Sequence, residues 1–106
     1  MPDDIELAVV VGTFEARTGR EEELAATLAK YVVLTRRRGD CRNVDLVASV
    51  LHPGRLVVVE KWVTPDAARG HLDAPETVEM AEAVRDLLAR PPDLDLLESV
   101  SAQDLE

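Results

Sequence analysis

The chain has 106 residues and a formal net charge of −9, from 21 acidic and 12 basic residues. This length is that of one domain, and we expect residues 1–106 to form it, with a core over about 6–101. The single cysteine excludes an intramolecular disulfide. The excess of acid disfavours nucleic acid and anionic membrane surfaces as partners, because both are bound through basic side chains.

The N-terminus and the apolar runs bear on location. The first residues, MPDDIEL, are acidic and lack the charged-then-apolar pattern of a signal peptide. The longest apolar run, from Leu7 to Val11, is far shorter than the roughly 20 residues of a membrane helix. One unpaired cysteine fits a reducing compartment. We therefore expect a soluble cytoplasmic protein.

The N-terminal half predicts a strand, a helix and a second strand. Residues 6–15 are apolar and rich in valine, which is typical of a buried strand. Acidic residues at 21–23 and basic residues at 36–38 match the dipole of a helix, with Gly39 as its expected stop. Residues 43–51 form the second predicted strand. The apolar face of the helix recurs at three- and four-residue steps: Leu24, Leu28, Tyr31, Val32 and Thr35.

The C-terminal half begins with a turn over residues 52–54 and a third strand over 55–63, which together predict an antiparallel hairpin. Thr64 and Pro65 suit the N-cap and first position of a short helix that ends near Leu72. A longer helix begins at Pro75 and is stopped by residues 90–92, and a last strand covers 94–101. The predicted apolar face of the longer helix is Val78, Ala81, Val84, Leu87 and Leu88.

The element order β-α-β-β-α-β predicts a ferredoxin-like α+β fold, a four-stranded antiparallel sheet with its helices on one face. In the third strand Val58, Glu60 and Trp62 share one face, yet Val57 and Val59 make the other face apolar too. A sheet with one solvated face should alternate cleanly, so we expect a second copy to cover the other face in a two-fold dimer. The alternative is that the short strands of a small protein are simply apolar on both faces.

Four segments occur in a characteristic order. They are VVGTFEARTGREEEL, the step at residues 39–41, the strand RLVVVEKW, and TPDAARGHLDAP, which ends at Pro75. The most specific part is the strand ending Glu60-Lys61-Trp62, followed by a helix with His71 near its end. This pattern, over residues 10–88, resembles the antibiotic-biosynthesis monooxygenase domain family.

The resemblance implies a dimeric α/β barrel in which two sheets face each other. It also implies a pocket in each subunit, between the sheet and the helices. Members of the family include oxygenases that use no metal, flavin or haem cofactor and act on aromatic polyketides and quinols. Others degrade haem, process a small signalling sugar derivative, or have no assigned reaction.

Trp62 and His71 are the predicted catalytic residues. The resemblance places Trp62 in the pocket, where its indole N–H would stabilise negative charge on a peroxy intermediate. The alternative for Trp62 is a well-packed core residue. The imidazole of His71 suits a base or proton shuttle near neutral pH, and its alternative is a structural role.

Four further residues are predicted substrate contacts. Glu60 would orient a base or bind a phenol hydroxyl, unless it forms an ion pair at the strand end. Asn43 would bond a substrate oxygen, although a turn cap explains it as well. Tyr31 would line the pocket or pack in the core. Val58 stands where the polyketide-oxidising members carry an asparagine.

Metals and cofactors are not predicted. The two histidines and Cys41 are scattered, the acids do not converge, and no nucleotide-binding motif occurs. Cys41 is a nucleophile by residue type alone, and a small residue filling a tight turn is the simpler interpretation.

Three functions follow. The first is a cofactor-independent monooxygenase that oxidises a small electron-rich aromatic with O2: a quinol, an anthrone or a polyketide-type phenol. The second is haem degradation with His71 as axial ligand, which is disfavoured because the first strand, AVVVGTF, lacks the asparagine of such members. The third is a non-catalytic dimeric domain that binds a small apolar ligand or a protein.

Overall fold

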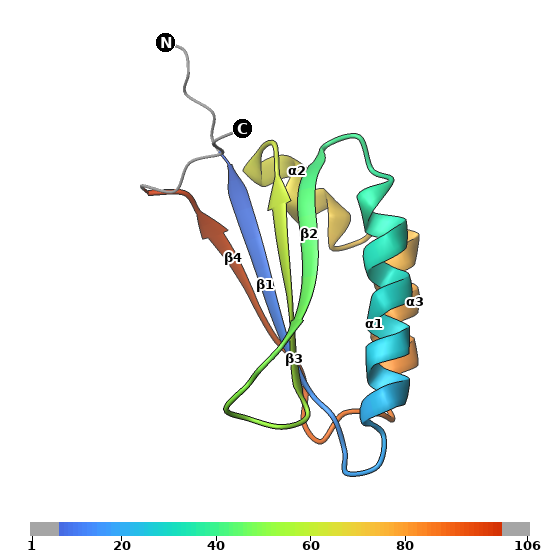
Figure 1. Cartoon of the computed structure of the whole chain (residues 1–106). Helices are drawn as coiled ribbons and strands as arrows, with labels where there is room; N and C mark the ends of the chain where they lie inside the picture. The colour runs from blue at the N-terminus through green and yellow to red at the C-terminus, as the bar shows by residue number, and fades with distance from the viewer. Residues whose placement is uncertain (1–6, 101–106) are drawn as a thin grey trace.

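The structure, a computed structural model, describes residues 7–100 and confirms the ferredoxin-like arrangement. The four strands form one antiparallel sheet in the order β2-β3-β1-β4, and the helices lie together on one side of it (Figure 1). Residue 6 of the first expected strand and residue 101 of the last lie outside the described residues. In chain order the elements are β1 (Ala8–Glu15), α1 (Glu21–Arg36), β2 (Cys41–Ala48), β3 (Arg55–Trp62), α2 (Pro65–His71), α3 (Pro75–Val84) and β4 (Asp93–Glu98).

Two local predictions are confirmed at atomic detail. The turn between β2 and β3 closes with a hydrogen bond from the Arg55 N–H to the His52 carbonyl, 3.1 Å, and Gly54 adopts a φ of 87°. Only glycine reaches that conformation without strain. At the start of α2, the Thr64 hydroxyl accepts the Ala67 N–H at 3.1 Å, and Pro65 occupies the first turn.

The end of α1 differs from the prediction. The helix ends at Arg36, and Gly39 has no positive φ, so it is not a left-handed cap. The N–H groups of Arg37 and Arg38 instead bond back to the carbonyls of the preceding turn. Those bonds satisfy two of the terminal carbonyls of the helix, those of Leu34 and Thr35, without a glycine cap.

The strand bounds also shift. β2 runs over Cys41–Ala48, and residues 49–51 belong to the turn, where Ser49 accepts the His52 N–H at 3.0 Å. Val50 and Leu51 are therefore exposed despite their apolar side chains. β4 ends at Glu98.

The third helix is shorter than predicted and turned about its axis. It ends at Val84, because the next backbone groups pair with the end of β1: Ala89 donates to Glu15, and Arg17 donates to Leu87, both at 2.8 Å. Leu87 and Leu88 are buried as expected. Val78 is 47% exposed and Ala81 is also exposed, while Met80 and Thr77 are buried in their place.

Burial alternates along the central strands. The inner face, toward the helices, carries Val10, Phe14, Val58 and Trp62, all almost fully buried. On the outer face, valines at positions 9, 11, 57 and 59 remain partly exposed. Within residues 7–100, no helix is long and apolar enough to cross a membrane.

The β4 edge is left open. β4 pairs with β1 alone, and all six of its residues are exposed. α3 packs beside α1, so the helical layer covers the other strands better than β4 (Figure 1). This incomplete cover leaves space between α3 and the β1–β4 edge.

Candidate functional site

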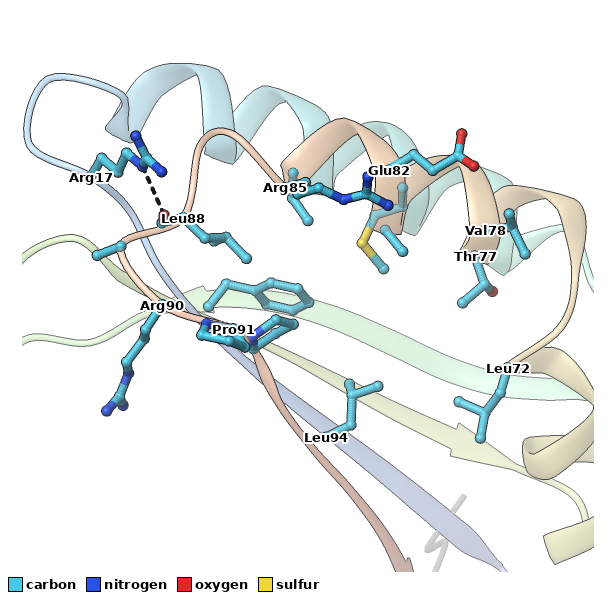
Figure 2. A pocket seen from close by; sticks show the side chains of 16 residues that line it. Arg17, Leu72, Thr77, Val78, Glu82, Arg85, Leu88, Arg90, Pro91 and Leu94 are labelled. Carbon is cyan, nitrogen blue, oxygen red and sulfur yellow. Dashed lines mark hydrogen bonds between the residues drawn. The ribbon is translucent and has the colours of Figure 1, made fainter.

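A groove of 740 Å³ opens between α3 and the β1–β4 edge (Figure 2). Its volume lies in the range of roughly 300–1,000 Å³ that small-molecule sites occupy. The walls are mainly apolar, and Val78 and Ala81, which are displaced from the predicted core face, help to form them. The principal wall residues are Phe14, Leu72, Met80, Val84, Leu88 and Leu94.

Gly12 keeps the floor of the groove open. It sits in the middle of β1 on the inner face, opposite Leu94 of β4. A Cβ atom there would stand 3.0 Å from the Phe14 ring and 3.1 Å from the Leu94 side chain. A glycine inside a strand often marks a close approach, and here any side chain would push on two groove walls.

A buried polar cluster lies beside the groove, centred on the Glu60 carboxylate. Tyr31 donates to Glu60 Oε2 at 2.5 Å, and Trp62 Nε1 donates to Glu60 Oε1 at 2.9 Å. Glu60 is only 4% exposed, so these two donors replace the water that the carboxylate loses on folding. Burial, reinforced by the charge of Glu60, raises the pKa of Tyr31, which therefore stays a phenol and a donor.

His71 completes this cluster and also contacts a second carboxylate. Its Nε2 lies 2.9 Å from Glu76 Oε2, and Arg38 binds both oxygens of Glu76 at 2.7 Å. The Arg38 guanidinium lowers the pKa of Glu76 to about 2. Because Glu76 is ionised, His71 carries a hydrogen on Nε2 and donates it. The Trp62 ring packs on the imidazole, with centroids 4.5 Å apart.

Thr77 joins the cluster to the groove. Thr77 lines the groove, and its hydroxyl donates to the His71 carbonyl at 2.7 Å and lies 3.4 Å from His71 Nδ1. Tyr31 Oη is also 3.4 Å from Nδ1, and Glu60 Oε1 is 4.0 Å away. Nδ1 therefore lies toward the oxygen atoms of Thr77, Tyr31 and Glu60, and of these three residues Thr77 lines the groove.

Four of the six predicted site residues come together in this cluster: Tyr31, Glu60, Trp62 and His71. None of them lines the 740 Å³ groove. Trp62 and His71 instead border a separate cavity of 250 Å³. The indole N–H is engaged by Glu60 rather than directed at open space.

The other two predicted contacts lie apart. Val58 is buried in the apolar core with Phe14. Asn43 is exposed, bonds Asp45 at 3.0 Å and pairs with Lys61, which places it on the outer face of the sheet.

Arg38, Glu76 and Gly12 were missed by sequence reasoning. An acid in the first turn of a helix is explained by the helix dipole, so Glu76 gave no separate signal. Arg38 was read as part of the basic helix end. The glycine inside a valine-rich strand was a usable signal, because glycine weakens a strand unless something needs the space.

Within the described residues, no group of three or more His, Cys, Asp and Glu side chains could hold a metal ion. Cys41 is a free, partly buried thiol. Burial raises its pKa, which disfavours the reactive thiolate.

The family model for antibiotic biosynthesis monooxygenases (ABM) matches residues 7–83. The chain belongs to this family. The match includes the polar cluster, β1 and most of α3, while β4 and the groove-lining residues from Val84 to Leu94 lie beyond it. A comparison with curated proteins finds no significant match.

Solved structures share the fold along nearly the whole chain. Rv0793 from Mycobacterium tuberculosis is 26% identical with a TM-score of 0.85, covering 92% of this chain and 99% of its own. SO0527 from Shewanella oneidensis is 26% identical with a TM-score of 0.83, covering 91% and 93%. A structure named antibiotic biosynthesis monooxygenase, 17% identical with a TM-score of 0.79, covers 88% and 98% and shows the fold alone.

Proposed function

We propose that this ABM domain is a cofactor-independent monooxygenase that oxidises a small electron-rich aromatic, of the quinol, anthrone or phenol type, with O2. The observation that carries the proposal is the apolar 740 Å³ groove that meets the His71 cluster at Thr77. A groove of this kind binds a flat aromatic ring system and excludes water from it. Membership of the ABM family supports the reaction class.

The reaction balances without an external reductant. An activated CH2 carbon of an anthrone loses a proton, and the resulting anion passes one electron to O2. The two radicals combine into a peroxide, which takes up a proton and eliminates water, leaving a carbonyl. One oxygen atom thus enters the product and the other leaves as water. The protein has to hold the anion in a dry site and to move one proton out and back.

His71 is the proposed proton acceptor, acting through the Thr77 hydroxyl. Rotation of that hydroxyl directs its hydrogen to Nδ1, 3.4 Å away, while its oxygen takes the substrate proton. Glu60, 4.0 Å from Nδ1, stabilises the positive imidazolium, and Tyr31 fixes Glu60. Trp62 positions the ring by packing on it.

The two remaining predicted contacts take different places in this proposal. Val58 lies in the apolar core that also contains Phe14. Asn43 has no part in it, because it lies on the outer face.

A second candidate, a non-catalytic domain that binds a small ligand, is favoured by one observation. The indole N–H and the Tyr31 hydroxyl both donate to the Glu60 carboxylate rather than to a ligand in the groove. Thr77 is the residue through which the cluster meets the groove. Haem degradation is less well supported. His71 is poorly suited to be an axial ligand, because its Nε2 is bonded to Glu76 and the residue does not line the groove.

We also propose that two copies associate through the outer face of the sheet. Support comes from the partly exposed valines of β1 and β3, which the helices leave uncovered. A second sheet would bury this apolar surface.

Oxygen uptake tests the proposed activity. Purified protein is mixed with a panel of reduced quinols and anthrones, and each rate is compared with spontaneous autoxidation. We expect a rate above autoxidation that falls strongly in His71→Gln and Thr77→Val. His52→Gln, which changes the exposed histidine of the β2–β3 turn, is the matched control and should leave the rate unchanged. Ligand binding to the groove without any uptake would favour the second candidate.

A further inference from the structure

The charged side chains that line the groove carry a net positive charge, whereas the net charge of the whole chain is negative. The protein carries a net charge of −9, yet the groove is bordered by Arg17, Arg85 and Arg90 and by a single acid, Glu82. The Glu82 carboxylate points outward from α3 (Figure 2). An anion that approaches this acidic protein therefore meets a locally positive field at the groove.

Two of the three arginines already have partners. Arg17 Nε donates to the Leu88 carbonyl at 2.9 Å, shown by the dashed line in Figure 2. Arg90 donates to Glu15 at 2.9 Å and points away from the groove. These bonds fix both side chains. The Glu15 carboxylate offsets the charge of Arg90, whereas the neutral carbonyl that binds Arg17 leaves the charge of Arg17 in place.

Arg85 is different. Its side chain makes no hydrogen bond or ion pair with any residue in the described range 7–100. It lies just beyond the end of α3 and runs along the upper edge of the groove, above the apolar wall (Figure 2). A guanidinium presents five donors in a planar fork that fits a carboxylate. Here all of its side-chain donors are available to a ligand.

We propose that the groove binds an aromatic acid, with its ring system on the apolar wall and its carboxylate on Arg85. This inference rests on the groove as the ligand site of the proposed function and adds a charge requirement to it. The wall favours an aromatic body over an aliphatic chain, because the Phe14 ring and the Met80 sulfur both contact aromatic faces well. Arg85 is the residue that sets the preference for an acid.

A matched pair of probes tests the charge requirement without any turnover. Naphthoate and naphthamide have the same ring system and nearly the same shape, and only naphthoate is charged at pH 7. Each is titrated into the full-length protein while two-dimensional amide NMR spectra are recorded. We expect naphthoate to bind about two- to fivefold more tightly, as a solvent-exposed ion pair allows. The shifted amides should belong to groove residues such as Leu72, Ala81 and Ala89.

Three variants assign the preference to one side chain. In Arg85→Gln the two probes should bind equally, and in Arg85→Lys part of the preference for naphthoate should return. Arg37→Gln is the matched control, since Arg37 is an exposed arginine at the end of α1 that does not line the groove. It should keep the wild-type ratio.

Each other outcome overturns a distinct claim. Equal affinities in the wild type, or an unchanged ratio in Arg85→Gln, would overturn the role of Arg85 and leave the groove as a site for neutral aromatics. Binding of neither probe, or shifts confined to residues outside the groove, would overturn the groove as the ligand site. Absence of oxygen uptake would bear on the proposed activity alone, because these titrations involve no reaction.

Discussion

Nε2 of His71 donates to Oε2 of Glu76 across 2.9 Å, and this bond ties the end of α2 to the start of α3. Arg38, which follows α1, binds the same carboxylate, so three helical segments meet at one ionised group. The bond also fixes the hydrogen of His71 on Nε2 and leaves Nδ1 toward Tyr31 and Thr77. A structural contact thereby decides which ring nitrogen is available for proton transfer.

The Glu76 contact predicts a pH dependence of stability. Arg38 lowers the folded-state pKa of Glu76 from its ordinary 4.5 to about 2. Ionised Glu76 therefore stabilises the fold fully above pH 4.5, and this contribution is lost as the pH falls from 4.5 toward 2. Between about pH 6 and pH 3, the urea midpoint of the wild type should fall more steeply than that of Glu76→Gln.

Glu79→Gln is the control, because Glu79 lies on the same helix but is exposed. Its midpoint should follow the wild type. Parallel curves for Glu76→Gln and the wild type would show that the Arg38 contact does not stabilise the fold.

Tyr31→Phe should destabilise the fold by about 2 kcal/mol, because it leaves one oxygen of the buried Glu60 carboxylate without its donor. The ring itself is retained, so packing changes little. Urea unfolding at neutral pH measures the difference. Thr27→Val, which removes a hydroxyl that donates to a carbonyl of the same helix, should change stability by less than about 0.5 kcal/mol. A Tyr31→Phe effect as small as that of the control would contradict the assigned bond.

Gly12→Val should close the groove. The new Cβ would stand 3.0 Å from Phe14 and 3.1 Å from Leu94, and two methyl groups would extend beyond it. The resulting overpacking should destabilise the fold by about 1–3 kcal/mol and weaken naphthoate binding by about tenfold or more. NMR titration measures the affinity, and Gly39→Ala, at a site with open space around it, should bind as the wild type does. Unchanged affinity in Gly12→Val would place the ligand elsewhere.

Val59→Lys should dissociate the proposed dimer. It places a charge among the outer-face valines of β1 and β3, between Val11 and Asp45, where a second sheet would have to bury it. Light scattering should show a dimeric mass for the wild type and a mass near 11.6 kDa for the variant. Val33→Lys, at an exposed valine on α1, should stay dimeric. A monomeric wild type would rule out the association.

Sequence patterns predicted the fold more fully than the site. The element order, the hairpin turn and the Thr64 cap depend on local chemistry, and all are confirmed. The extent of α3 was wrong because its last turn gives up its helical bonds to pair with the end of β1, a contact far away in sequence. Val78 is exposed for a different reason, because it faces a groove that β4 leaves open.

The polar cluster was partly predictable. The shared face of Glu60 and Trp62 follows from strand periodicity, and the helical face that includes Tyr31 points at them. The position of the groove was not predictable, because it depends on how far α3 lies from β4. No local pattern encodes that separation.

Oxygen-18 labelling distinguishes monooxygenation by this protein from spontaneous autoxidation. An anthrone is incubated under oxygen-18 gas with the wild type, with His71→Gln or with no protein, and product mass and hydrogen peroxide are both measured. We expect one labelled oxygen atom per product, a wild-type rate above the other two reactions, and no matching release of peroxide. A wild-type rate equal to the protein-free rate, or peroxide released in step with an unlabelled product, would contradict the proposed monooxygenase activity.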